Sequence, residues 1–165
     1  LYKRGWNGVN IDINSLSIDY FNSIRPNDIN INIAVADKKS IKSFYYQKEK
    51  SPLNTLNFKL AGKHFSNNFK KKKIKSDTLN SIIDKTKFKG KKIDFLNIDA
   101  EGNDFQVLKG LNFERYKPKL ICVEMVDIFK PSKKVIKKHK IYKFLIKKKY
   151  KLVWSAHFSH IFKKK

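Results

Sequence analysis

The alternation of apolar and polar positions predicts strands and helices that follow one another along the chain. In residues 8–13 and 29–35 every second side chain is apolar, which is the period of a half-buried strand. Between them, a helix is predicted to begin at Ser17 as its N-cap and to end before Arg25 and Pro26. A strand, a helix and a second strand in this order indicate a parallel βαβ unit.

The second half of the chain repeats this alternation with more strongly apolar strands. Residues 93–99 and 120–125 are rich in apolar side chains, which is typical of strands buried on both faces of a parallel sheet. A helix over residues 102–109 is expected between them, closed by Gly110. Residues 150–154 and 157–162 predict two strands across a short turn, which makes the final pair antiparallel.

Other segments carry weaker signals. Asp77 can cap a helix that ends near Gly90, and residues 133–149 place apolar side chains on one face of a basic helix, with His139 as a packing residue on that face. Residues 41–46 are able to form a strand or hairpin arm, and residues 70–73, four consecutive lysines, are expected to form a solvated loop.

These elements predict an α/β fold, an open and mainly parallel sheet with helices on both faces. A chain of 165 residues that is 41% hydrophobic is expected to form one domain over residues 1–165. No apolar run approaches the roughly 18 to 20 residues of a membrane span, so no transmembrane helix is expected. The first residues lack an initiator Met and show no signal-peptide pattern, so an internal piece of a longer protein is expected. Cys122 lies in an apolar run without a disulfide partner, which favours a reducing, cytoplasmic location.

The formal charge of +24 raises the hypothesis of a nucleic-acid-binding module. Phe44, Tyr45 and Tyr46 would then serve as stacking surfaces, although aromatic residues at strand spacing more often pack in the core or at a sheet edge. Nearly all of the excess charge is lysine, whereas arginine is the residue that makes bidentate contacts to phosphate and guanine. The composition therefore favours weak polyanion binding over specific nucleic-acid recognition.

Acidic residues stand where the predicted parallel strands end. Ligands of open α/β sheets bind outside the carboxyl ends of the strands, so these carboxylates are the candidate site: Asp12, Asp37, Asp99, Glu101 and Glu124. Asp12 is placed to accept hydrogen bonds from ribose hydroxyls, and Asp37 could reach an adenine amino group. The alternative is that each aspartate starts a turn or caps a helix. The four histidines lack zinc-like spacing, so no metal site is predicted.

Several segments resemble FkbM-type methyltransferases. Residues 5–12 read GWNGVNID, and Arg25-Pro26 precedes the run IAVAD at residues 33–37. Residues 93–102 read IDFLNIDAEG and are followed by LKGL at residues 108–111 and PKLICVE at residues 118–124. This series is similar to the hallmark "DFLKIDVEG…LKG…P…E" run of that family, and the likeness covers nearly the whole chain.

The resemblance implies a Rossmann-like sheet that binds S-adenosylmethionine and passes its methyl group to an oxygen of a small-molecule or glycan-type acceptor. Asp12 with Ile13 would hold the ribose, and Asp37 with Ala36 would hold the adenine. Asp99 would bind the methionine end of the cofactor, and Asp99 and Glu101 are the predicted catalytic residues. The first strand of the family and its glycine-rich turn should precede Leu1 and are absent. A truncated, noncatalytic methyltransferase relative therefore stays open as an alternative.

Overall fold

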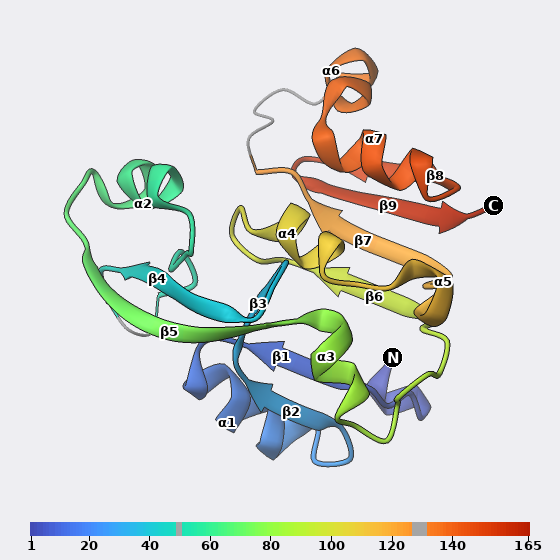
Figure 1. The fold of residues 1–165 in the computed structure, drawn as a ribbon, viewed down its shortest axis with the longest axis horizontal. Helices are drawn as coiled ribbons and strands as arrows, with labels where there is room; N and C mark the ends of the chain where they lie inside the picture. Colours follow the sequence, from blue (N-terminus) through green and yellow to red (C-terminus); the bar gives the residue numbers. More distant parts are fainter. Residues whose placement is uncertain (49–50, 127–131) are drawn as a thin grey trace.

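The computed structural model describes residues 1–48, 51–126 and 132–165, and the N-terminal part forms the predicted parallel βαβ unit (Figure 1). A short 3-10 turn, η1 (Tyr2–Arg4), precedes β1 (Val9–Asp12), α1 (Ser15–Ile24) and β2 (Ile29–Asn32). β1 and β2 pair in parallel from Val9↔Ile29 to Asp12↔Asn32. The predicted cap Ser17 is wrong by three positions, because the side chain of Asn14 accepts the Leu16 N–H and begins the helix there.

The single strand expected over residues 29–35 is two strands in two sheets. The pairing of β2 with β1 ends at Asp12↔Asn32, where β1 itself ends. The next strand, β3 (Ala34–Ala36), belongs to another sheet and pairs in parallel with β5 (Lys70–Thr78). β4 (Ser40–Tyr46), the predicted hairpin arm, pairs antiparallel with β5 along its whole length. The helix α2 (Phe58–Phe65) lies between these two strands in the sequence.

The four lysines at residues 70–73 form the start of β5, so the predicted loop is wrong. β3 pairs only with the last three residues of β5, which leaves the other edge of the lysine segment without a strand in the described part of the chain. All four side chains are exposed. Charged side chains, lysine above all, keep a free strand edge from pairing with another chain, which gives these lysines a structural role.

The third sheet has the order β6-β7-β9-β8 and confirms the antiparallel C-terminal pair. β6 (Phe95–Ile98) and β7 (Leu120–Glu124) are parallel, whereas β9 (Ser159–Lys164) runs antiparallel to both β7 and β8 (Tyr150–Ala156). The helices packed on this third sheet form the main hydrophobic core together with it. The fully buried residues of this core include Leu108, Tyr116, Ile121, Leu145 and Phe162. The remaining helices are α3 (Leu79–Asp84), α4 (Asp104–Lys109), α5 (Phe113–Tyr116), α6 (Lys133–Lys138) and α7 (Lys140–Lys147).

The boundaries of three further helices differ from the sequence prediction. α4 begins at Asp104 and not at residue 102, and α3 ends at Asp84 and not near Gly90. The helix expected over residues 133–149 is divided at His139, whose backbone is extended and whose Nδ1 accepts the Ile141 N–H at the start of α7. The predicted cap Asp77 is replaced by Thr78, whose hydroxyl accepts the Ser81 N–H. Asp77 instead forms an ion pair with Lys85 at 2.8 Å. The longest helix described, α1, has 10 residues, so none of these helices could cross a membrane.

The sheets confirm an α/β fold with parallel strands, although the strands form three sheets and not one. In the described residues β1 pairs only with β2, and β6 pairs only with β7. The arrowheads of β1, β6 and β7 point the same way in Figure 1. One edge of β1 and one edge of β6 are therefore unpaired, in strands that share a direction.

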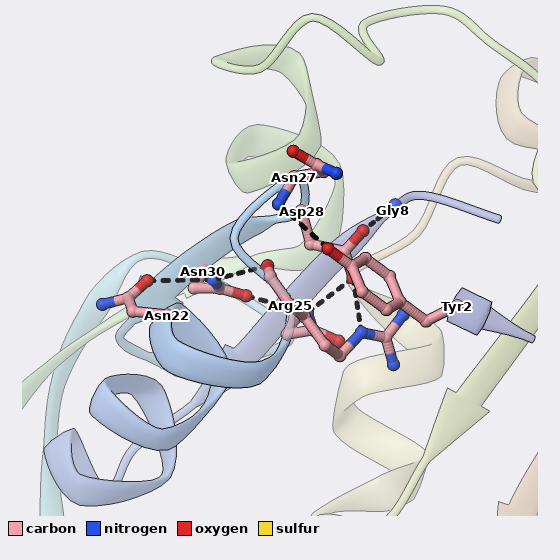
Figure 2. Close-up of polar contacts among 8 residues, drawn as sticks. Tyr2, Gly8, Asn22, Arg25, Asn27, Asp28 and Asn30 are labelled. Atoms are coloured by element: carbon pink, nitrogen blue, oxygen red, sulfur yellow. Dashed lines mark hydrogen bonds and ion pairs between the residues drawn. The ribbon is translucent and has the colours of Figure 1, made fainter. Parts of the chain in front are cut away.

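A buried carboxylate, which the sequence analysis did not single out, joins the parts of the βαβ unit (Figure 2). The side chain of Asp28 is fully buried and accepts hydrogen bonds from the Gly8 N–H at 2.9 Å, from Asn10 Nδ2 at 3.0 Å and from Arg25 Nε at 2.6 Å. The guanidinium of Arg25 in turn lies over the ring of Tyr2. Asp28 thus connects the entry to β1 with the turn before β2.

Replacing Asp28 by alanine is expected to lower the free energy of unfolding by about 2–3 kcal/mol, because three partly buried donors lose a charged acceptor. Urea denaturation followed by circular dichroism measures this change. Asp19, exposed on α1, is the matched control, and Asp19→Ala should change the stability by less than about 0.5 kcal/mol. Equal effects of the two substitutions would contradict a structural role of Asp28.

Candidate functional site

A cavity of about 790 Å³ lies between the unpaired edges of β1 and β6. Val9, Ile11 and Asp12 of β1 line one side, and Phe95–Ile98 of β6 line the other. Side chains from β3, α3 and the segment before α2 complete the wall: Val35, Leu79, Ile83, Pro52 and Thr55. The cavity is thus bounded by residues that belong to all three sheets.

Four of the predicted site residues meet at this cavity. Asp12 and Ile13 line it at the carboxyl end of β1, and Asp99 and Glu101 line it just after β6. Asp12 is half-buried, and its Oδ1 accepts the Asn14 N–H at 2.8 Å. The turn that the alternative reading foresaw is therefore present, and it holds the Asp12 carboxylate in place at the cavity wall.

The other two predicted cofactor residues do not line the cavity. Ala36 is fully buried, and its carbonyl oxygen packs closely on Gly110. Asp37 forms ion pairs with Lys109 at 3.1 Å and with Lys42 at 3.8 Å. The hydrogen bond from Lys109 lowers the pKa of Asp37. The adenine-binding role of Ala36 and Asp37 stays a prediction, while their neighbour Val35 lines the cavity.

The turn that carries Glu101 is held by side chains from outside it. Glu101 and Gly102 both have positive φ, 45° and 82°. The hydroxyl of Thr55 donates to the Glu101 carbonyl oxygen at 2.6 Å, and Asp104 accepts the N–H groups of Ala100 and Gly102, each at 3.1 Å. Left-handed backbone is costly for a residue with a side chain, so these bonds keep Glu101 in an unusual but defined position.

Sequence reasoning missed both residues that hold this turn. Asp104 had a local signal, because it lies two residues after a glycine, at the start of a predicted helix. Thr55 had none, since its contact spans 46 residues. Thr55 and Asp104 are both buried, so their role is to position the turn.

Several carboxyl groups lie close together at the ends of β6 and β7, and the pKa values of three of them are raised. Burial raises the pKa of Asp104 to about 6. Burial, and then the charges of Asp99 and Asp104, raise the pKa of Glu124 to about 7. Burial and Asp99 also raise the pKa of Glu101. Shifted carboxyl groups at one edge of a sheet are typical of functional sites, and they favour a cationic ligand.

No group of side chains suited to a metal ion occurs among the residues that the structure describes. The thiol of Cys122, on β7, is half-buried, and burial followed by the charge of Glu124 raises its pKa. A raised pKa disfavours the thiolate, so Cys122 is not an activated nucleophile. His160 is fully buried and its Nδ1 lies 2.7 Å from the Ser155 hydroxyl, whereas His157 is exposed in the turn before β9.

A smaller cavity of about 210 Å³ adjoins the same carboxyl groups. Its walls come from α2, the turn at Gly102, the end of β7 and the start of α7, with Leu60, Gly102, Glu124, Met125 and Ile141 among the lining residues. Asp104 also lines it. The carboxyl cluster therefore lies next to both cavities.

An α/β domain with acidic residues and a cavity at the carboxyl ends of parallel strands has the general form of a nucleotide-type ligand-binding domain. The family model described as the methyltransferase FkbM domain matches residues 1–152. The chain therefore belongs to the FkbM methyltransferase family, as the sequence motifs indicated. No curated protein and no solved structure matches this chain.

Proposed function

We propose that this methyltransferase domain uses S-adenosylmethionine, which binds at the carboxyl-end side of the larger cavity beside Asp12 and Asp99, to methylate an oxygen acceptor. The observation that carries the proposal is the meeting of Asp12 and Asp99, which come from separate sheets, at the carboxyl-end side of one cavity. Family membership supplies the class of reaction.

In this proposal each carboxylate meets a different part of the cofactor. Asp12 accepts hydrogen bonds from the two ribose hydroxyls, with Ile13 beside the sugar. Asp99 and Glu101 face the methionine end, where the ammonium and the sulfonium are positively charged. Burial raises the pKa of Glu101, and a cation bound beside it would favour its ionised form. The acceptor oxygen attacks the methyl carbon in line with the sulfur, so the protein contributes mainly position.

We also propose that an additional parallel strand lies between β1 and β6 and joins the sheets into one Rossmann-like sheet. An unpaired strand edge presents backbone N–H and C=O groups that need partners. Two such edges, in strands of the same direction, border the same cavity. A strand inserted there would pair with both edges, and the turn after it would reach the cofactor side. The truncated, noncatalytic relative is the alternative if no such strand exists.

The acceptor is proposed from family likeness, as a hydroxyl-bearing small molecule or glycan, and the location as cytoplasmic. The lysines of β5 lie along a free strand edge outside the walls of both cavities. A weak attraction of this edge to polyanions is compatible with a methyltransferase, and it needs no separate nucleic-acid site.

Titration calorimetry with S-adenosylmethionine tests the cofactor. Two proteins are compared: residues 1–165 alone, and the same chain extended by the coding sequence upstream of Leu1. We expect micromolar binding by the extended chain and binding at least about 10-fold weaker by residues 1–165, because the unfilled cavity lacks part of its wall. Absence of binding by both proteins would contradict the cofactor assignment. Equal affinities would contradict the additional strand while leaving the cofactor in place.

A further inference from the structure

Asp99 and Glu124 form a carboxyl pair in the wall between the two cavities. β6 and β7 are paired in register up to Ile98↔Val123, so the next residues, Asp99 and Glu124, are neighbours at the ends of adjacent strands. Besides burial, the charge of Asp99 and a side-chain hydrogen bond with it both raise the pKa of Glu124. Asp99 lines the larger cavity, and Glu124 lines the smaller one. The pair therefore connects the proposed cofactor site with a second space.

The surroundings of Glu124 contain groups of both signs. Asp99 after β6 and Asp104 on α4 raise the pKa of Glu124, whereas the hydroxyl of Ser159 on β9 lowers it. Ser159 is the direct neighbour of Glu124 in the β7–β9 ladder. The other charged or titratable side chains that line the smaller cavity are Lys59 and Lys63 of α2, with His139 and Lys140 at the start of α7. Burial is the largest cause of the raised pKa, about 7.

We propose that the smaller cavity holds the acceptor hydroxyl and that Glu124 takes up its proton. This inference rests on the proposed function, because it needs the methyl donor in the larger cavity beside Asp99. Leu60, Met125 and Ile141 supply apolar walls of the smaller cavity, and three lysines line it together with the carboxyl groups of Glu124 and Asp104. Such a pocket suits a polar molecule that presents a hydroxyl group to Glu124.

In the proposed transfer step Glu124 accepts the proton of the acceptor hydroxyl. The O–H bond of the acceptor breaks and its proton moves to the ionised carboxylate of Glu124, while the oxygen forms a bond to the methyl carbon. The carbon–sulfur bond breaks and its electron pair stays on sulfur, which changes from a positive sulfonium to a neutral thioether. The proton on Glu124 then leaves to solvent. A base whose pKa lies near the working pH is suited to such a step.

The charge of the bound cofactor would determine whether Glu124 is ionised. When a sulfonium binds beside Asp99, the positive charge favours the ionised carboxylate of Glu124, so a proton is released. After methyl transfer the sulfur is neutral, and this electrostatic effect disappears. Glu124 would thus be ionised before the reaction and able to hold a proton after it.

Calorimetry of the upstream-extended chain in two buffers of different ionisation enthalpy measures this proton release without knowledge of the acceptor. At pH 7 we expect the release of a fraction of a proton per S-adenosylmethionine bound, because Glu124, whose pKa is raised to about 7, is partly protonated in the free protein. S-adenosylhomocysteine, which lacks the sulfonium charge, should release almost none. Glu124→Gln should lower the release by S-adenosylmethionine to the smaller part that Glu101 and Asp104 contribute, and change its affinity by less than about 10-fold. Glu114→Gln, at an exposed position on α5, is the matched control and should keep the release.

The outcomes separate the two proposals. If S-adenosylmethionine does not bind, the proposed function fails and the role of Glu124 fails with it. If it binds and Glu124→Gln releases the same number of protons as the unsubstituted chain, only the role of Glu124 is overturned. Equal release by S-adenosylmethionine and S-adenosylhomocysteine in the unsubstituted chain also overturns it. If Glu124→Gln does not fold, the comparison of S-adenosylmethionine with S-adenosylhomocysteine in the unsubstituted chain still tests the role of Glu124. Glu124→Asp should then retain proton release.

Discussion

Replacing Asp12 by alanine is expected to weaken S-adenosylmethionine binding by about 100-fold, which corresponds to about 2.7 kcal/mol. The carboxylate lines the larger cavity at the end of β1 and is held by the Asn14 N–H. Two ribose hydroxyls donating to one carboxylate form charge-assisted hydrogen bonds, each stronger than a neutral one. Their loss explains the size of the effect, which titration calorimetry of the upstream-extended chain measures.

Two controls separate binding from folding in this experiment. Asp19→Ala removes a carboxylate from the exposed face of α1 and should leave the affinity unchanged. Asp12→Asn retains an oxygen for the Asn14 N–H but loses the charge, so it should lie between alanine and the unsubstituted chain. An Asp12→Ala variant that melts normally and binds with undiminished affinity would contradict the placement of the ribose at β1.

Replacing Gly102 by alanine is expected to lower the free energy of unfolding by about 2–3 kcal/mol. The φ of Gly102 is +82°, a conformation that costs a residue with a Cβ about 1–2 kcal/mol. The new Cβ would also lie 2.9 Å from Leu60 Cδ2 and 3.4 Å from Asn57 Nδ2, so the ends of these two side chains have to move, at an added cost of up to about 1 kcal/mol. Because Gly102 follows Glu101, cofactor binding should weaken as well. Chemical denaturation and calorimetry measure the two effects.

Gly5 provides a matched control for backbone conformation. Its φ is +81°, nearly that of Gly102, but nothing lies within 4 Å of the position of an added Cβ. Gly5→Ala should therefore show only the backbone cost, about 1–2 kcal/mol, and should leave cofactor binding intact. If the two alanine variants are equally stable, the close packing of Gly102 against α2 does not contribute to the stability of the turn.

The sequence by itself determined the elements whose signal is local. The alternation in residues 8–13 and 29–35 and the apolar runs at residues 93–99 and 120–125 predicted the parallel strands, because side chains in a strand alternate between faces or are buried on both. Acidic residues placed at the ends of those strands pointed to the cavity edge. The motif at residues 93–102 indicated the family that the comparison confirms.

The tertiary structure alone decided which of these residues meet. Asp12 and Asp99 line one cavity, whereas Asp37, an equally strong candidate in the sequence, forms ion pairs with Lys109 and Lys42. The contact of Thr55 with Glu101 and the pairing of Glu124 with Asp99 join residues far apart in the chain. Such contacts depend on strand register and on the packing of whole elements, and a local pattern of apolar and polar residues carries no information about either.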